Sequence, residues 1–140
     1  SDVYKRQYSK IMRKLMGTTM TLKWKHGEQE NLWCIMPAHP IAKGIPEKLF
    51  LPQEEMYGEY FDIPKPDDVI FAGWFSGGQV FRSGCTFTRG LGKVFYFQPG
   101  HEEYPIYYIP EIQQIIKNAV RFCAPPEGTR KYLDNQEVTE

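Results

Sequence analysis

A short apolar run followed by one strongly amphipathic segment constrains this chain more than any other feature. The run Lys93–Phe97 is β-branched and aromatic, and Gly92 and the Pro99-Gly100 pair bound it, which is typical of a β-strand. Because nearly every residue in the run is apolar, we expect a central strand that is covered on both faces. A strand of this kind needs a helix beside it, and the next segment supplies one.

Residues 110–123 are predicted to form that helix. Apolar side chains recur there at i, i+3, i+4, i+7, i+8 and i+11, which gives one buried face. These side chains are Ile112, Ile115, Ile116, Ala119, Val120 and Cys123. Pro110 suits the first helical position, and Pro125 ends the helix. A strand followed by a covering helix is half of a βαβ unit, so the polar loop 98–103 is expected at the sheet edge where ligands bind.

Composition limits the partners. The 140 residues include 17 basic and 17 acidic ones, so charge gives no reason to expect nucleic acid or an anionic membrane as a partner. The three cysteines form no paired spacing, which argues against a disulfide framework or a zinc knuckle and favours a reducing cytosol. No apolar run approaches the length of a membrane span. We therefore expect a cytoplasmic protein of one domain or part of one.

The rest of the chain is rich in strands. Strands are predicted at residues 20–25, 31–36, 49–51, 69–75 and 80–88. His26-Gly27 is interpreted as a turn between the first two. Residues 1–7 are expected to be a non-native leader, 8–125 the domain and 126–140 a flexible tail. Because α/β folds normally alternate strands and helices, one complete helix among many strands suggests the carboxy-terminal portion of a longer domain.

Four ungapped blocks carry a family resemblance. They are PAHPIAKGI (37–45), QEEMYGE (53–59), WFSGGQVFRSGC (74–85) and FYFQPGHE (95–102). With these blocks the chain resembles the ThuA-like family, named for trehalose utilisation, from about Tyr8 to Pro125. The resemblance implies an α/β fold with a three-layer flavodoxin-like sheet, as in the class I glutamine amidotransferase-like superfamily. It also implies that the N-terminal half of the domain is missing from this chain.

The superfamily relation does not extend to amidotransferase chemistry. Glutamine amidotransferases carry a catalytic His with a Glu two residues on, and His101 falls at about that place. Here the acid, Glu102, follows directly, and two adjacent side chains are expected to splay apart. Cys85 lies in a strand-like run without the strand-to-helix elbow of a nucleophile. Glutamine amidotransferase activity is therefore not supported.

His101 is the strongest candidate for catalysis. An imidazole at the end of a strand with acids beside it suits a general base or a metal ligand, although it could instead cap the following loop. Glu55 and Glu102 are the candidate catalytic acids. Glu55 shares a face with Tyr57 if that stretch is extended. The cofactor is unknown; a divalent metal is compatible with the residues, and His101 is the one ligand that the sequence offers for it.

Five residues are candidates for binding substrate: His39, Tyr57, Glu59, Arg82 and Tyr104. Four of them have a structural alternative. His39 suits a packed plug in its proline-rich turn, Glu59 a solvated acidic edge and Arg82 an exposed strand position. Tyrosines such as Tyr104 often only pack a loop. We predict that His101 shares one site with at least one residue among His39, Glu55, Tyr57 and Glu59.

The resemblance implies a role in the utilisation of trehalose or a related disaccharide, with the sugar or its keto derivative as the small-molecule partner. The reaction type stays open among hydrolysis, elimination and isomerisation, and a homo-oligomer is also left open. The alternative is a non-catalytic carbohydrate-binding or accessory module, because a fold does not fix a function.

Overall fold

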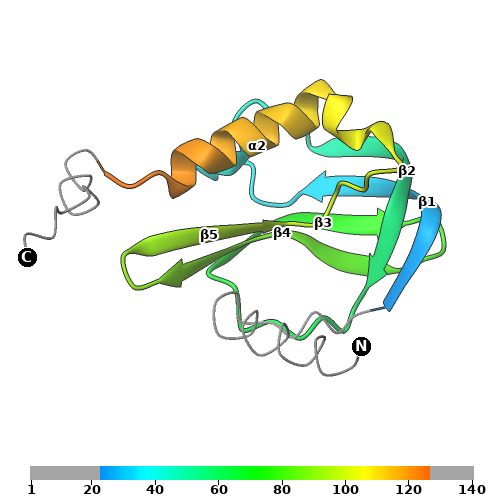
Figure 1. Cartoon of the computed structure of the whole chain (residues 1–140), viewed down its shortest axis with the longest axis horizontal. Coiled ribbons are helices and arrows are strands. Elements are labelled where there is room, and N and C mark those ends of the chain that lie inside the picture. The colour runs from blue at the N-terminus through cyan, green and yellow to red at the C-terminus, as the bar shows by residue number, and fades with distance from the viewer. Residues whose placement is uncertain (1–22, 127–140) are drawn as a thin grey trace, which may run out of the picture.

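The computed structural model describes residues 23–126. Its elements are β1 (Lys23–Cys34), η1 (Pro40–Ala42), β2 (Lys48–Gly58), β3 (Asp68–Phe75), β4 (Val80–Arg89), β5 (Gly92–Phe97), η2 (Pro105–Tyr108) and α2 (Pro110–Cys123), where η marks a short 3-10 helix. The strands form one curled sheet, and α2 lies across one side of it (Figure 1). The predicted leader, the start of the first predicted strand and most of the predicted tail lie outside the described residues.

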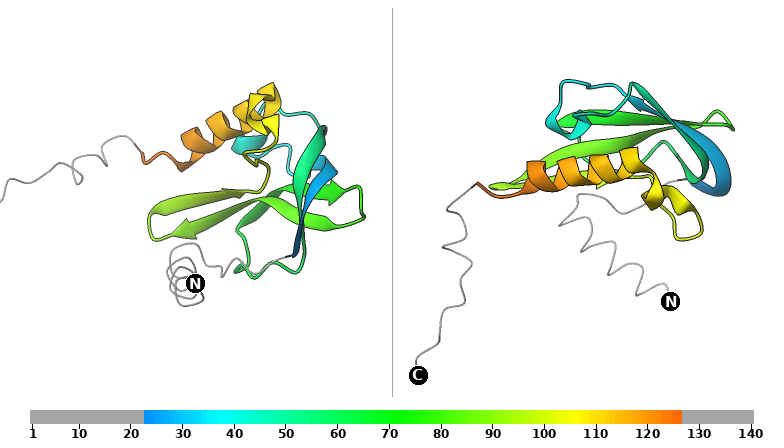
Figure 2. Two further views of the ribbon diagram at one scale, coloured as in Figure 1. Left: turned by 45° about the vertical axis from the view of Figure 1, so that its right-hand side comes forward. Right: turned by 90° about the horizontal axis from the view of Figure 1, so that it is seen from above.

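The sheet runs in the order β2-β1-β3-β4-β5, and every neighbouring pair is antiparallel. The expected three-layer flavodoxin-like sheet is therefore wrong for this chain. Parallel neighbours need a crossover connection of about a dozen residues or more, usually a helix. The links 76–79 and 90–91 are far too short for that, so β3, β4 and β5 form a meander of hairpins. Two further views show α2 beside the curled sheet, with no second layer of helices in the described part (Figure 2).

The strand that was expected at the centre lies at an edge. Within residues 23–126, β5 pairs only with β4, and residues 94–97 are half-buried rather than fully covered. The apolar sequence of β5 reflects contact with α2 on one side and with the aromatic side chains of β4 on the other. An apolar run therefore gave the strand correctly but not its position in the sheet.

The first two predicted strands are one continuous strand. β1 passes straight through His26-Gly27, where the register with β2 shifts between Lys25 and Glu28 and again between Glu28 and Glu30. Gly27 adopts φ +77°, a conformation that L side chains rarely adopt. The expected turn is therefore a β-bulge. The short strand predicted at 49–51 likewise extends through the acidic block to form β2.

The helix begins and ends where predicted, but its buried face is narrower. Ile112, Ile115 and Ala119 are buried, whereas 38% of Ile116 and 65% of Val120 are exposed. The expectation that Ile116 and Val120 are buried is wrong. The sheet ends at β5, so these side chains line an open apolar groove beside that strand. No helix within residues 23–126 is long and apolar enough to cross a membrane.

The described part of the chain has two apolar cores. The first joins the helix to the sheet and contains Leu32, Cys34, Ile41, Ala42, Leu49, Leu51, Ile70, Phe71, Ile106, Ile112, Ile115 and Ala119. The second has no helical residue and contains Met56, Phe61, Ile63, Phe75, Phe81, Cys85 and Phe87. The loop 59–67 contributes Phe61 and Ile63 to the second core. The strands are thus packed on both sides, which fixes the ends of β1, β2 and β5 relative to one another.

Candidate functional site

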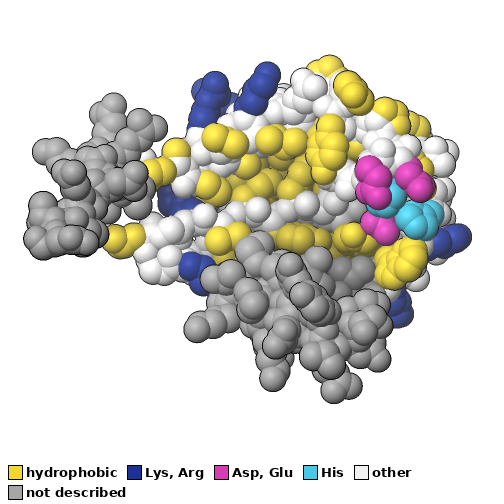
Figure 3. Space-filling model, viewed as in Figure 1, with side chains coloured by type: hydrophobic (Ala, Val, Ile, Leu, Met, Phe, Trp, Pro, Cys, Tyr) yellow, Lys and Arg dark blue, Asp and Glu magenta, His cyan; other side chains and the backbone are white. Residues whose placement is uncertain are grey.

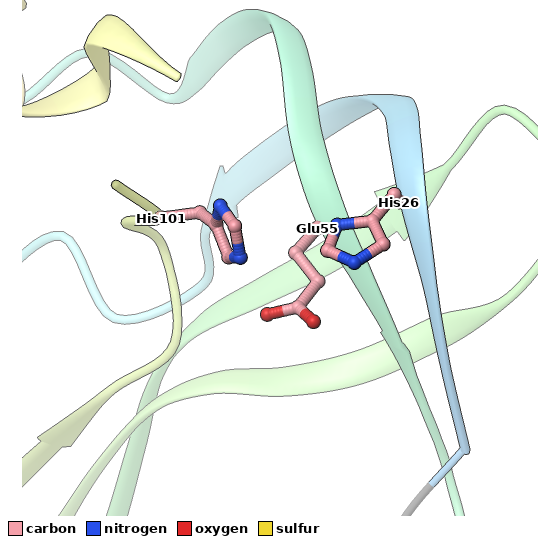
Figure 4. Close-up of side chains that lie close together, drawn as sticks. All are labelled: His26, Glu55 and His101. Atoms are coloured by element: carbon pink, nitrogen blue, oxygen red, sulfur yellow. The ribbon is translucent and has the colours of Figure 1, made fainter. Parts of the chain in front are cut away.

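Three polar side chains from distant parts of the sequence meet at one end of the sheet. His26 comes from the bulge of β1, Glu55 from β2 and His101 from the loop after β5. One potential ligand atom from each lies within 4.8 Å of the other two. Figure 4 shows the two imidazole rings flanking the Glu55 carboxylate. We call these residues the His/Glu cluster. The predicted proximity of His101 and Glu55 is therefore present.

The register of the first two strands explains why His26 reaches Glu55. Lys25 pairs with Met56 and Glu28 with Glu54, so the bulge between them lies opposite Glu55. A regular strand would turn successive side chains to alternate faces, and a bulge re-aims them locally. The cluster thus depends on the positive φ of Gly27, because the bulge is what directs His26 towards β2.

Glu54 ties the His101 loop to β2. It is fully buried, and its two carboxylate oxygens accept different backbone N–H groups, Glu55 at 2.8 Å and Gly100 at 2.9 Å. Burial raises the pKa of Glu54, while these two hydrogen bonds and the nearby His101 act in the opposite direction. One side chain therefore fixes the residue before His101 and the backbone of Glu55.

The backbone conformation and packing of this loop require glycine at position 100. Its φ is +131°, and a Cβ atom there would overlap the hydroxyl of Tyr107. Only glycine adopts this backbone conformation readily while another side chain approaches so closely. Tyr107 therefore packs directly on the residue that precedes His101.

The His101 ring is mostly buried and uses its two nitrogens differently. Nδ1 accepts the Glu103 backbone N–H at 3.2 Å, so the ring does cap the following loop. Nε2 lies 3.6 Å from Oε2 of Glu102. The expectation that these neighbours splay apart is thus wrong, because the bend after Gly100 brings Glu102 back towards the ring. Nε2 is the nitrogen that stays available for a proton or a ligand.

Aromatic rings surround the cluster. The Trp24 ring is 60% exposed and lies edge-on to His26, with ring centroids 5.2 Å apart. The Tyr104 ring lies against His101 at 5.4 Å. Burial, a hydrogen bond with Glu55 and the negative charge of Glu55 raise the pKa of Tyr57 to about 12. Tyr57 therefore stays a neutral phenol beside the Glu55 carboxylate.

The surface view shows how the charge is distributed. Acidic and histidine side chains gather at one end of the molecule, over the end of the sheet where β1 and β2 lie, with apolar side chains next to them (Figure 3). Glu102 belongs to this region, and its side chain is 87% exposed. The region therefore combines negative charge with exposed aromatic surface.

His39 is engaged elsewhere. Nδ1 of this residue accepts the Ile41 N–H at 3.1 Å and caps η1, while Nε2 lies 3.6 Å from Asp68. Its ring packs on Phe122 with ring centroids 4.9 Å apart. These contacts match the packed plug that the proline-rich turn suggested as the alternative to substrate binding.

Glu59 and Arg82 form an ion pair of their own. The Arg82 guanidinium donates to the two Glu59 oxygens at 2.7 and 2.9 Å and to the Phe61 carbonyl at 2.9 Å. Burial alone would raise the pKa of Glu59, but the hydrogen bonds and charge of Arg82 lower it. The pair fastens the start of the loop 59–67 to β4. Neither residue is part of the His/Glu cluster, and their substrate-binding role stays a prediction, as do the roles of the other candidates.

Cys85 has the environment of a core residue. It is fully buried among the aromatic side chains of the second core, and burial raises the pKa of its thiol to about 11. A thiol with this pKa carries almost no thiolate at neutral pH, and the thiolate is the reactive form. This agrees with the expectation that Cys85 is not a nucleophile.

A second polar group lies inside the sheet. Glu30 of β1 is fully buried, and its Oε1 is 3.1 Å from the Ser83 hydroxyl of β4. The same hydroxyl lies 3.2 Å from Oε1 of Gln98, whose amide nitrogen donates to the Glu55 carbonyl at 3.1 Å. We call Glu30, Ser83 and Gln98 the buried polar chain. It leads from the middle of the sheet to the backbone of the His/Glu cluster.

The direction of these hydrogen bonds assigns a proton to Glu30. A serine hydroxyl has one proton, so Ser83 cannot donate to Glu30 and to Gln98 at once. Because the amide nitrogen of Gln98 faces a carbonyl, its Oε1 needs the Ser83 proton, and Glu30 must then donate to Ser83. Burial also raises the pKa of Glu30 to about 8, against the effect of Ser83. Its Oε2 has no hydrogen-bond partner among residues 23–126.

Sequence reasoning missed His26 and Glu30. His26 was interpreted as part of a turn, although the alternation of Trp24 and His26 continues the strand face and could have placed it there. Glu30 alternates with Leu32 and Cys34, so an acid on an apolar face was the available signal. Neither signal identifies a site residue until the pairing of β1 with its neighbouring strands is known.

The chain was compared with known proteins. The family model ThuA, described as trehalose utilisation, matches residues 2–123. No match was found among curated proteins.

Proposed function

The chain belongs to the ThuA family, and we propose that it acts on trehalose or a related disaccharide, or on its keto derivative, at the His/Glu cluster. Family membership supports a role in carbohydrate utilisation. The observation that carries the finer proposal is the meeting of His101 and Glu55 beside exposed aromatic rings. Sugar sites combine a few polar groups that orient the hydroxyls with flat apolar rings that pack on the C–H faces.

The polar groups suit proton transfer. His101 keeps Nε2 available because Nδ1 is occupied by the Glu103 amide, and the Glu55 carboxylate lies beside it. An imidazole and a carboxylate that face one space can remove a proton from a sugar carbon next to a carbonyl and return it to an oxygen. A keto-disaccharide offers such an acidic C–H, and the leaving glycosidic oxygen can accept the proton. Trp24 offers its exposed ring to one face of the sugar.

Conversion and binding should be measured separately. We expect the purified chain to convert trehalose or its keto derivative. Proton NMR spectra of the sugar measure this conversion. His101→Ala and Glu55→Gln should each lower the rate about 100-fold or more, the usual effect of losing an acid–base group. Glu47→Gln is the matched control, because it also removes one carboxylate and Glu47 is exposed and lies outside the cluster.

The outcome separates two classes of protein. Sugar binding that survives His101→Ala, without conversion by the wild type, would favour the non-catalytic carbohydrate-binding module. The absence of both binding and conversion for all these sugars would contradict the proposal.

A further inference from the structure

We propose that His26, Glu55 and His101 together bind a first-row divalent cation. The inference deepens the proposed function, because the cation would lie where the sugar is proposed to bind, but metal binding itself can be measured without any sugar. The carrying observation is that one ligand atom from each residue lies within 4.8 Å of the others. The three residues come from two strands and a loop, and the interactions described above fix each of these segments.

The ligand chemistry favours a transition metal over a hard cation. Imidazole nitrogens suit zinc, iron, nickel and copper, whereas magnesium and calcium prefer oxygen ligands. Two histidines and one carboxylate are a ligand set of catalytic zinc and of mononuclear iron sites, which keep positions open for water or substrate. His26 is exposed and the other two residues are half-buried, so the open positions would face solvent. This is the arrangement of a site that receives a substrate, not of a closed structural site.

The cluster must contract slightly to hold a cation. Tetrahedral ligands with bonds of about 2.0–2.1 Å lie about 3.3 Å from one another, which is closer than the present limit of 4.8 Å. His26 can supply this movement, because it is exposed and its ring contacts with Trp24 and His101 are edge-on. The backbone at Glu55 and before His101 can stay in place, since Glu54 accepts a hydrogen bond from each, and only side-chain movement is needed there.

The surrounding charge favours a cation. The buried Glu54 and the exposed Glu102 both lie at the His101 ring, and the Glu102 carboxylate approaches Nε2 to 3.6 Å. The nearest basic side chain on the same strand as His26 is Lys25, and its ammonium group is turned to Glu28 at 3.2 Å. Two histidines therefore lie beside acidic side chains, and a divalent charge would be stabilised there.

Metal binding would also break a hydrogen bond in the loop that carries His101. In the neutral His101 ring, Nδ1 accepts the Glu103 N–H, so the proton lies on Nε2. Ligation through Nε2 displaces that proton and requires Nδ1 to carry one instead. The hydrogen bond from the Glu103 N–H is then lost. The Glu103 amide should consequently change its NMR shift on metal binding, although Glu103 is not a ligand.

Zinc titration of the chelator-treated chain tests the inference. We expect one zinc ion per chain, measured by competition with a chromophoric chelator. His26→Ala, Glu55→Gln and His101→Ala should each weaken binding at least tenfold, and the Glu103 amide resonance should shift in the wild type. His39→Asn removes the third histidine of the chain and should leave zinc binding unchanged.

The results distinguish this inference from the proposed function. Zinc binding that His26→Ala and Glu55→Gln leave unchanged would overturn the metal site, and so would no binding at all. Sugar conversion by the metal-free chain would then still support the proposed function. Conversely, zinc binding that depends on the three residues would stand even if no disaccharide bound. His26→Ala is the decisive variant, because only the metal site assigns that residue a role.

Discussion

The His/Glu cluster and the buried polar chain each contain a glutamate, and their surroundings make these two acids different groups. Glu55 lies between two imidazoles at the surface, with a phenol beside it. Glu30 lies inside the sheet with a serine as its hydrogen-bond partner, and no basic side chain of residues 23–126 lowers its pKa. A buried carboxyl without a counter-ion takes up a proton, because burial penalises the charged form.

The two regions are nevertheless joined. Gln98 donates to the Glu55 carbonyl and lies at the end of the buried polar chain. Glu54 is near both, because it holds the loop of His101 and its charge disfavours ionisation of Glu30. The buried chain thus supports the backbone of the surface cluster at some cost in stability. Functional sites commonly carry such locally unfavourable groups.

Glu30→Gln should have the largest effect. The unfolded chain releases this proton near pH 4.5, while the folded protein keeps it to about pH 8. Between these values the unfolded state binds fewer protons, so the free energy of unfolding falls as pH rises, by at most about 1.4 kcal/mol per pH unit. Glutamine is neutral and can still donate to Ser83. The variant should be more stable than the wild type by up to about 3 kcal/mol at pH 7, and equal to it near pH 4.

Urea unfolding at several pH values between 4 and 8 measures this difference. Glu47→Gln is the matched control, because Glu47 is exposed and its replacement also removes one carboxylate. A stability difference between the wild type and Glu30→Gln that stays constant from pH 5 to pH 8 would show that Glu30 is ionised in the folded protein. The assignment of its proton would then be wrong.

Glu54→Gln should have the next largest effect, which is on the zinc affinity of the His/Glu cluster. A glutamine can accept only one of the two N–H groups that Glu54 now accepts, because its amide nitrogen would face the other. Either the His101 loop or the Glu55 backbone is then released. Zinc affinity should fall about tenfold, as is usual when a group that orients a ligand is lost. Zinc affinity equal to that of the wild type would show that Glu54 does not position the cluster.

The sequence predicted local structure better than assembly. Hydrophobic periodicity and the Gly and Pro residues at element ends predicted one helix and three strands correctly. These are the helix Pro110–Cys123 and the strands near 69–75, 80–88 and 93–97. Their arrangement was not predicted correctly, because an apolar run does not show whether its neighbour is parallel or antiparallel. The short links at 76–79 and 90–91 contained that information. Links this short join antiparallel strands, but the expectation of an α/β layer outweighed that signal.

The same limit explains which site residues were found. His101 and Glu55 stood out as polar residues next to strand signals, and the structure brings them together. His26 was missed because a glycine after it suggested a turn, and a bulge and a turn share that residue preference. His39 and Arg82 had the right chemistry but are held by local partners, Ile41 and Glu59. Such partners become visible only when the strands have been placed in register.

Glu102→Gln should have the smallest effect on zinc affinity and sugar conversion. It tests whether Glu102 belongs to the cluster. Its carboxylate lies 3.6 Å from Nε2 of His101, so it was a candidate for catalysis by adjacency. Its side chain is 87% exposed, and charge interactions of such groups are screened by water and salt. We expect zinc affinity and sugar conversion to change less than about threefold, with the small loss shrinking further in added salt. A loss of tenfold or more, independent of salt, would instead make Glu102 a fourth ligand or a catalytic acid. If Glu102 is a fourth ligand, four side chains surround the metal and close the site. The open position that the proposed substrate needs would then have to come from the release of one ligand.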